Sequence, residues 1–139
     1  MKKRFLIVDD HSTNRGFIKD VFLYFELSCD EAKNGREAVE KWAHEDFLAI
    51  LMDIEMPVMD GLQAAQIIRT REKQEERSHT PIYAVSGCTA FSNPKEICRM
   101  AGMDGFIAKP ITINQLLEVV MPLTHRYKKS LSRPTNPTE

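Results

Sequence analysis

The fold of this chain is decided by residues 49–61, which read AILMDIEMPVMDG. A short apolar run ends abruptly at the carboxylate Asp53, and after a brief loop Asp60 and Gly61 open an amphipathic segment. An apolar run of this length between turn signals is typical of a strand buried on both faces of a parallel sheet. Ligands of such sheets bind beyond the carboxyl ends of the strands. Asp53 therefore stands where a functional site is expected.

The composition is that of one soluble globular domain. The chain has 139 residues, of which 42% are hydrophobic and 28% charged, close to the average for such domains. A formal net charge of −1 gives no argument for direct binding of nucleic acid or of a membrane. The start, MKKRFLIVDD, has an apolar run too short for a signal peptide, and no segment is long enough to span a bilayer. We therefore expect a cytoplasmic protein.

Neither the cysteines nor the histidines have the spacing of a metal site. An odd number of cysteines without such spacing favours reduced thiols in the cytoplasm; these residues are Cys29, Cys88 and Cys98. The histidines are scattered, so we expect them at the surface or at helix ends; these residues are His11, His44, His79 and His125.

Strand signals alternate with helix signals five times along the chain. The expected strands are residues 5–8, 27–32, 49–52, 81–85 and 104–109, and a helix with an apolar stripe or a capping signal follows each. Short connections between such repeats predict an α/β fold, a doubly wound parallel sheet of five strands with five flanking helices. We expect one domain over residues 1–125 and, because the sequence turns polar there, a disordered tail over residues 126–139.

Polar side chains follow four of the five expected strands. Asp9 and Asp10 follow the first strand, Asp53 the third, Ser86 the fourth and Lys109 the fifth. Three carboxylates at one edge of a sheet repel each other unless a cation lies among them, and ligands that are all oxygen favour Mg²⁺. A lysine and a hydroxyl beside them would bind the oxygens of a phosphoryl group. Asp53 is then the candidate nucleophile, which would form an acyl phosphate.

The chain resembles the response-regulator receiver domains of two-component signalling. The motifs VDD, MDIEMPVMDG, VSG and AKP match that family in order, and the likeness extends over about residues 3–125. The resemblance implies a flavodoxin-like receiver fold. It also implies a domain that accepts a phosphoryl group from the phosphohistidine of a histidine kinase or a histidine phosphotransfer domain. Such a domain catalyses its own phosphorylation and dephosphorylation with Mg²⁺ and acts on a downstream protein target.

The resemblance also assigns roles to the acidic residues. It implies that Asp53 is the phosphoacceptor and that Mg²⁺ is bound by Asp10, Asp53 and the backbone carbonyl of Glu55. Asp9 would orient the water shell of the metal. The carboxylate of Glu55 would lie close enough to hinder or to orient an attacking water molecule.

Further roles follow from the resemblance for the last two strands. Ser86 would bond a phosphoryl oxygen, Lys109 would pair with the phosphate, and Phe106 would be the aromatic residue that changes rotamer on activation. A cis peptide bond is implied between Lys109 and Pro110. Ser86 and Gly87 stand where Thr and Ala are commoner in the family, which keeps a hydroxyl followed by a small residue. Phe106 replaces a frequent Tyr and therefore lacks a hydroxyl group.

We expect the partner to dock on one edge of the first helix, at Arg15, Ile18 and Phe22. Apolar residues that recur every four positions place the centre of the buried stripe at Phe17, Val21 and Phe25. Ile18 and Phe22 then fall at the margin of this stripe, next to the active-site edge. The alternative is that Ile18 and Phe22 belong to the core.

Two other classes of protein compete with the receiver hypothesis. An aspartyl-phosphate phosphatase commonly has a second acid two residues after its nucleophile, and Glu55 has this offset from Asp53. The sequence has no signal for a cap insertion or a substrate pocket, which disfavours an enzyme of that class. A flavin-binding carrier of similar topology is disfavoured because three acids would repel its phosphate. A receiver without an output domain is expected to be free-standing or part of a hybrid kinase, and the start at Met1 favours the former.

Overall fold

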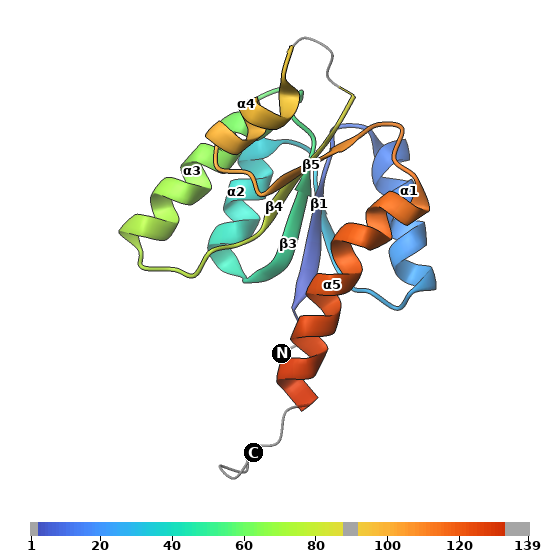
Figure 1. Cartoon of the computed structure of the whole chain (residues 1–139). Helices are drawn as coiled ribbons and strands as arrows, with labels where there is room; N and C mark the ends of the chain where they lie inside the picture. The colour runs from blue at the N-terminus through green and yellow to red at the C-terminus, as the bar shows by residue number, and fades with distance from the viewer. Residues whose placement is uncertain (1–2, 88–91, 133–139) are drawn as a thin grey trace.

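Five parallel strands form the central sheet, in the order β2-β1-β3-β4-β5 (Figure 1). The computed structural model describes residues 3–87 and 92–132, so the predicted free thiol of Cys88 lies outside the described residues. The strands are β1 Arg4–Val8, β2 Cys29–Ala32, β3 Phe47–Met52, β4 Ile82–Ser86 and β5 Gly105–Ala108. The helices are α1 Ser12–Tyr24, α2 Gly35–His44, α3 Gly61–Gln74, α4 Pro94–Met100 and α5 Ile113–Ser132. The doubly wound α/β fold predicted from the sequence is confirmed.

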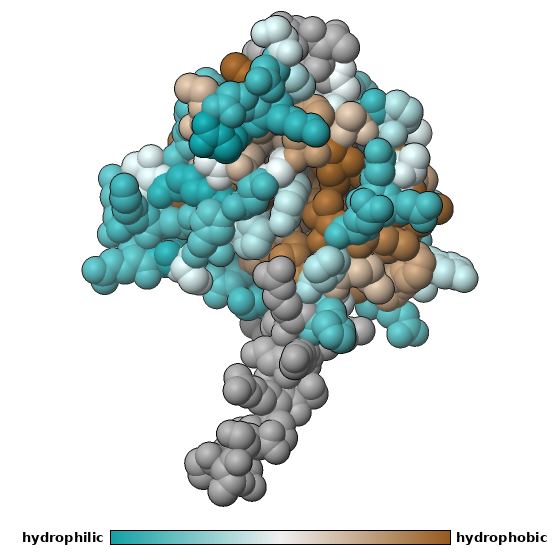
Figure 2. Space-filling view, viewed as in Figure 1, coloured by the Kyte–Doolittle hydropathy of each residue, from teal (hydrophilic) through white to brown (hydrophobic). Residues whose placement is uncertain are grey.

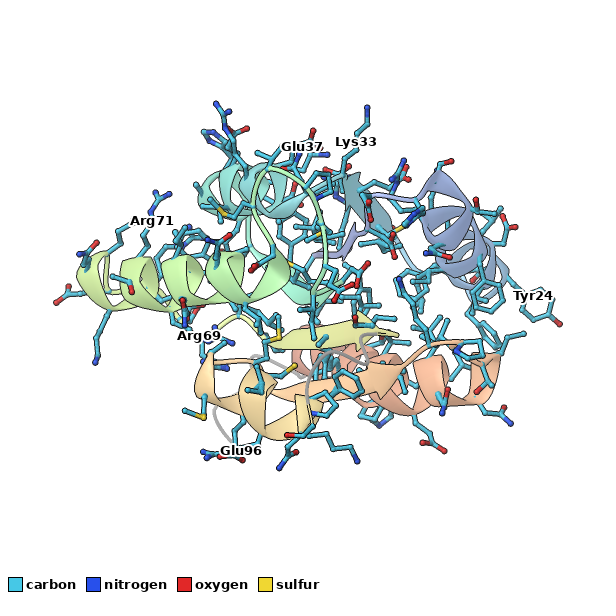
Figure 3. All side chains as sticks on the ribbon, turned by 90° about the horizontal axis from the view of Figure 1, so that it is seen from above. Tyr24, Lys33, Glu37, Arg69, Arg71 and Glu96 are labelled. Atoms are coloured by element: carbon cyan, nitrogen blue, oxygen red, sulfur yellow. The ribbon has the colours of Figure 1, made fainter. Side chains whose placement is uncertain are left out.

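The sheet is covered by helices on both faces (Figures 1 and 3). Side chains alternate along each strand, so Phe5 and Ile7 of β1 pack in one apolar cluster with residues of α1 and α5. Leu6 and Val8 point the other way, into a second cluster with residues of α2, α3 and α4. Trp42 of α2 is fully buried in this second cluster, as its helical spacing predicted. Burial on both faces explains why the strands read as continuous apolar runs.

The buried face of α1 differs from the prediction by a rotation of the helix. Its buried residues are Ile18, Val21 and Phe22, whereas 37% of Phe17 is exposed. The ring of Phe22 contacts the ring of Phe5 edge to face, with 5.1 Å between the centroids. The predicted stripe through Phe17 and the observed stripe through Ile18 and Phe22 both have helical spacing. The contact of Phe22 with Phe5 of β1 favours the observed one. The prediction that Phe17 lies at the centre of the buried stripe is wrong.

The last helix extends further than the sequence pattern indicated. α5 continues to Ser132, so the helix extends into the segment from residue 126 for which the sequence predicts a disordered tail. Polar composition alone does not end a helix, because Lys and Arg are among the better helix-forming residues. Residues 133–139 lie outside the described part of the chain. Across residues 3–87 and 92–132, none of the helices combines the length and the apolar character needed to cross a membrane.

Candidate functional site

The carboxyl ends of β1, β3, β4 and β5 bring the predicted polar residues to one edge of the sheet. The strand order reverses between β1 and β3, and ligand sites of doubly wound sheets form at such a point. Asp9, Asp53 and Ser86 are buried there, with exposed fractions of 3%, 5% and 2%. Lys109 follows β5 and reaches the same place. The prediction of one shared edge is therefore confirmed for these residues.

Lys109 joins two of the carboxylates. Its Nζ atom lies 2.8 Å from Oδ2 of Asp9 and 3.2 Å from Oδ2 of Asp53. Burial lowers the pKa of Lys109, but the hydrogen bond to Asp9 and the charge of Asp53 outweigh it, so the net pKa is raised. The ammonium group is thus held in its charged form between two acids that are 100 and 56 residues away in sequence.

Asp53 lies in an environment that disfavours its charge. Burial raises the pKa of its carboxyl above the usual value, and the nearby charge of Asp9 acts in the same direction. Lys109 and a hydrogen bond with Ser86 lower this pKa, but they compensate only in part. A carboxylate that is desolvated and bonded to one lysine and one hydroxyl is a reactive group poised for a ligand, since perturbed carboxylates concentrate at functional sites.

Asp9 and Asp10 differ in the use of their oxygen atoms. Both oxygens of Asp9 accept hydrogen bonds, from the backbone N–H of His11 at 2.9 Å and from the side chains of Asn14 and Lys109 at 3.2 and 2.8 Å. In contrast, Oδ1 of Asp10 is buried and receives no hydrogen bond from any residue in the described ranges. A buried carboxylate oxygen without a donor is costly unless a cation or a water molecule satisfies it. Asp10 is therefore the residue with coordination capacity to spare.

The carboxylate oxygens at this edge fit a hard divalent cation. Ligand atoms of Asp9, Asp10 and His11 lie within 4.8 Å of one another. Carboxylate oxygens are the ligands that Mg²⁺ prefers, and it takes few of them directly. His11, a histidine that the sequence analysis expected at the surface or at a helix end, is the exposed N-cap residue of α1 and lies beside both acids.

The loop after β3 passes very close to Asp53. A Cβ atom on Gly61 would lie 2.1 Å from the carbonyl oxygen of Asp53, so only glycine permits this approach. Earlier in the loop, Val58 has a φ of 71° and is 75% exposed. The backbone N–H of Met59 donates to the carbonyl of Pro57 at 2.8 Å across it, which forms a γ-turn. A β-branched residue in this conformation stores strain beside the site.

Ser86 and Phe106 share one face of the sheet. Phe106 pairs with Ala84 in the register of β4 and β5, two residues before Ser86 on the same side of the strand. Phe106 packs against the cluster under α2, α3 and α4 and is partly buried. The peptide bond between Lys109 and Pro110 is cis, as the resemblance implied.

The predicted docking residues do not form an accessible surface. Ile18 and Phe22 are core residues, with exposed fractions of 3% and 0%. The side chain of Arg15 is 11% exposed. Its guanidinium donates to the carbonyl of Asp9 at 2.7 Å and to Glu31 at 2.9 Å. The docking prediction is wrong for Ile18 and Phe22, because α1 turns this edge toward the sheet.

A groove beside the site remains accessible on the same helix. It has a volume of about 210 Å³ and lies between α1 and the loop after β5. Its lining includes Asn14, Phe17, Lys109, Pro110 and Ile111. Figure 2 shows further apolar surface toward the middle of the face on which β5 and α5 lie. Phe17, expected at the centre of the core, is thus an exposed aromatic residue next to the active-site edge.

Comparison with known proteins defines the class. The model of the response regulator receiver domain family matches residues 5–121, and the chain belongs to this family. It is 35% identical over 120 residues to hybrid signal transduction histidine kinase A of Dictyostelium discoideum. The alignment covers 86% of this chain but only 6% of that kinase. The family match does not support the phosphatase alternative.

Two solved structures illustrate the likeness. One is the receiver domain of the sensor histidine kinase PA1611 from Pseudomonas aeruginosa, which has a magnesium ion coordinated in its active site cleft. It is 27% identical, with a TM-score of 0.76 over 90% of this chain and 99% of the other. The other is the receiver domain of the Saccharomyces cerevisiae response regulator Ssk1 in a co-crystal with the histidine phosphotransfer protein Ypd1. It is 25% identical, with a TM-score of 0.79 over 99% of this chain and 97% of the other.

Proposed function

We propose that Asp53 of this receiver domain accepts a phosphoryl group from the phosphohistidine of a partner protein. The observation that carries the proposal is the environment of Asp53. Its carboxylate is buried, its pKa is raised by that burial, and its Oδ2 atom lies 3.2 Å from the ammonium group of Lys109. Asp9 is also buried at a strand end beside Lys109, but hydrogen-bond donors of the protein already occupy both of its oxygens, which leaves Asp53 as the better candidate.

The transfer exchanges one bond for another. A carboxylate oxygen of Asp53 attacks phosphorus, the phosphorus–nitrogen bond of the donor breaks, and the electron pair leaves with the donor imidazole. The product is an acyl phosphate on Asp53. Lys109 and the hydroxyl of Ser86 would bind the phosphoryl oxygens as charge develops on them. Attack by water on the same phosphorus returns the carboxylate and releases phosphate, which is the self-catalysed dephosphorylation expected of the family.

Mg²⁺ is the cofactor that the site residues fit. Asp10, Asp53 and the backbone carbonyl of Glu55 would hold the ion directly, and the unsatisfied oxygen of Asp10 supports this assignment. Asp9 would not bind the ion directly but would orient its water shell, because hydrogen-bond donors of the protein already occupy both of its oxygens. When bound, the ion would supply positive charge that offsets the repulsion between the acids and an incoming phosphoryl group.

Ser86 and Phe106 are the proposed switch. A phosphoryl group bound by Ser86 draws the end of β4 toward Asp53, and this movement vacates space on the face that Phe106 shares. The ring of Phe106, which is only partly buried, can then turn inward. Its lack of a hydroxyl means that apolar packing alone stabilises the inward position.

We place the partner at the groove between α1 and the loop after β5. The partner is a histidine kinase or a histidine phosphotransfer protein, as in the Ssk1 co-crystal with Ypd1. The groove borders Lys109 and exposes Phe17, so a helix that carries phosphohistidine would reach Asp53 from here. Aromatic residues that become buried near the centre of an interface commonly carry much of its binding energy.

Intact mass measurement after incubation with acetyl phosphate tests the proposed function. We expect wild-type protein to gain one phosphoryl group in the presence of Mg²⁺ and to stay unlabelled with EDTA. The variant Asp53→Asn should stay unlabelled in both conditions. Asp60→Asn is the matched control, because Asp60 lies in the same loop and Asn preserves its capping role; it should label normally. Labelling of Asp53→Asn at the wild-type level would refute the assignment.

A further inference from the structure

His11 holds a position that its own helix does not explain. It is the N-cap residue of α1, yet its side chain makes no capping hydrogen bond. The imidazole instead turns toward the acids, and Nδ1 lies 3.2 Å from Oδ1 of Asp10 and 3.4 Å from Oδ1 of Asp9. The side chain is 67% exposed, so burial does not hold it in place.

The distance between His11 and Asp10 is that of two ligands of one ion. Two neighbouring ligands at about 2.1 Å from an octahedral cation lie roughly 3 Å apart. The Nδ1 atom of His11 and Oδ1 of Asp10 are 3.2 Å apart, and that oxygen receives no hydrogen bond from the described residues. An imidazole nitrogen beside a buried oxygen that lacks a donor is the arrangement that a shared cation would stabilise.

A second histidine–aspartate pair, His79 with Asp104, differs from the pair of His11 with Asp10. Nε2 of His79 lies 2.8 Å from Oδ1 of Asp104, a normal hydrogen-bond distance. The other oxygen of Asp104 accepts hydrogen bonds from Arg69 and from the backbone N–H of Ile82. This carboxylate is fully used, so the His79 pair is an ordinary structural contact.

We infer that His11 is a metal ligand together with Asp10 and that it shifts the preference of the site toward cations that accept an imidazole, such as Ni²⁺. This inference rests on the proposed function, since it concerns the same metal site. Carboxylate, carbonyl and water ligands suit Mg²⁺, whereas imidazole suits Ni²⁺ and Zn²⁺. Loss of the imidazole therefore weakens Ni²⁺ binding strongly and Mg²⁺ binding little. Asp9 contributes orientation only, because its oxygens are occupied.

Isothermal titration with NiCl₂ and with MgCl₂ tests this inference. The variants are His11→Asn, which keeps a good N-cap residue, and His11→Ala, with His79→Ala as the matched control. We expect both His11 variants to lose at least tenfold in Ni²⁺ affinity while their Mg²⁺ affinity changes less than twofold. His79→Ala should match the wild type for both metals. A direct readout is the ¹⁵N resonance of the His11 imidazole, whose Nδ1 should shift on addition of Zn²⁺.

The outcomes separate this inference from the proposed function. Ni²⁺ affinity that does not depend on His11, with Mg²⁺ still bound, overturns the inference and leaves the proposed function intact. An unmoved Nδ1 resonance in the presence of saturating Zn²⁺ also overturns it. If neither Mg²⁺ nor Ni²⁺ binds the wild-type protein, the inference and the metal dependence of the proposed function both fail.

Discussion

Phe17 and Ile18 are neighbours in sequence, and the structure predicts opposite consequences for their replacement by alanine. Ile18 is 3% exposed, and truncation of a buried isoleucine to alanine costs about 2–5 kcal/mol. An unfolding entropy of about 2.1 cal/mol/K per residue over 139 residues gives ~0.3 kcal/mol/K. A loss of about 3 kcal/mol therefore lowers the Tm of Ile18→Ala by ~10 °C. Phe17 is 37% exposed, so its partial burial is worth about 1 kcal/mol, or ~3 °C.

The two substitutions are expected to differ in the opposite sense in their effect on phosphotransfer. Phe17→Ala should keep wild-type labelling by acetyl phosphate, because Phe17 touches neither Asp53 nor Lys109 through a polar contact. It should lose at least tenfold in the rate of phosphotransfer from a phosphorylated histidine phosphotransfer protein that labels the wild type; Ypd1 is the first donor to use. Ile18→Ala should accept phosphate from both donors at temperatures well below its Tm. Thermal unfolding by circular dichroism and the two labelling rates are the measurements.

Two results would refute this reasoning. Equal transfer rates from the protein donor for wild type and Phe17→Ala would remove the groove beside α1 as the docking surface. A Tm of Ile18→Ala within 2–3 °C of wild type would contradict the burial of Ile18, since a core truncation costs more. It would also support the orientation of α1 that the sequence periodicity predicted, with Phe17 at the centre of the buried stripe.

Three further substitutions test the loop and the switch. Val58→Gly should raise the free energy of unfolding by about 0.5–1 kcal/mol, because relief of the positive φ exceeds the entropy cost of glycine. Chemical denaturation measures this change. Unchanged or lower stability would contradict strain at this turn. Gly61→Ala should lower the free energy of unfolding by about 1–3 kcal/mol or more. It should also slow labelling of Asp53, since the added Cβ displaces the backbone of Asp53. Normal stability and labelling would argue against the close approach. Ser86→Ala should still be labelled by acetyl phosphate, but loss of the phosphoryl partner, worth about 1–3 kcal/mol, should reduce the NMR response of Phe106; a full response would exclude Ser86 as the relay.

The sheet and its functional edge were predictable from the sequence because local signals agreed with the global fold. The run that ends at Asp53 is apolar on both faces, and such a run in an α/β chain is typical of a central strand of the parallel sheet. Parallel strands end at one edge, so the sequence positions of Asp9, Ser86 and Lys109 already determined that they meet. The structure adds how they meet: Lys109 bridges two acids, and Asp10 keeps an unsatisfied oxygen.

The rotation of α1 was not predictable by the same reasoning. Phe17 and Ile18 both belong to apolar sets with helical spacing, and periodicity defines a stripe only to within about one residue. The contact between the rings of Phe22 and Phe5 decides the rotation, and it joins residues that no local pattern connects. The end of α5 was missed for a related reason, since a polar sequence is compatible with both a helix and a disordered tail.

The charges at the site connect its separate features. Asp9 and Asp53 share the single ammonium group of Lys109, and Asp10 lies beside Asp9, so three carboxylates and one lysine would leave two negative charges, the charge that one divalent cation offsets. Burial raises the pKa of Asp53, and a cation among its neighbours would favour the ionised carboxylate that acts as the nucleophile. Lys109 is shared between Asp9 and Asp53 at 2.8 and 3.2 Å, and a cation on Asp10 would leave it able to turn from the acids to a phosphoryl oxygen. The proposed phosphorylation of Asp53 is therefore expected to need the metal, because a cation would offset the negative charge around this carboxylate.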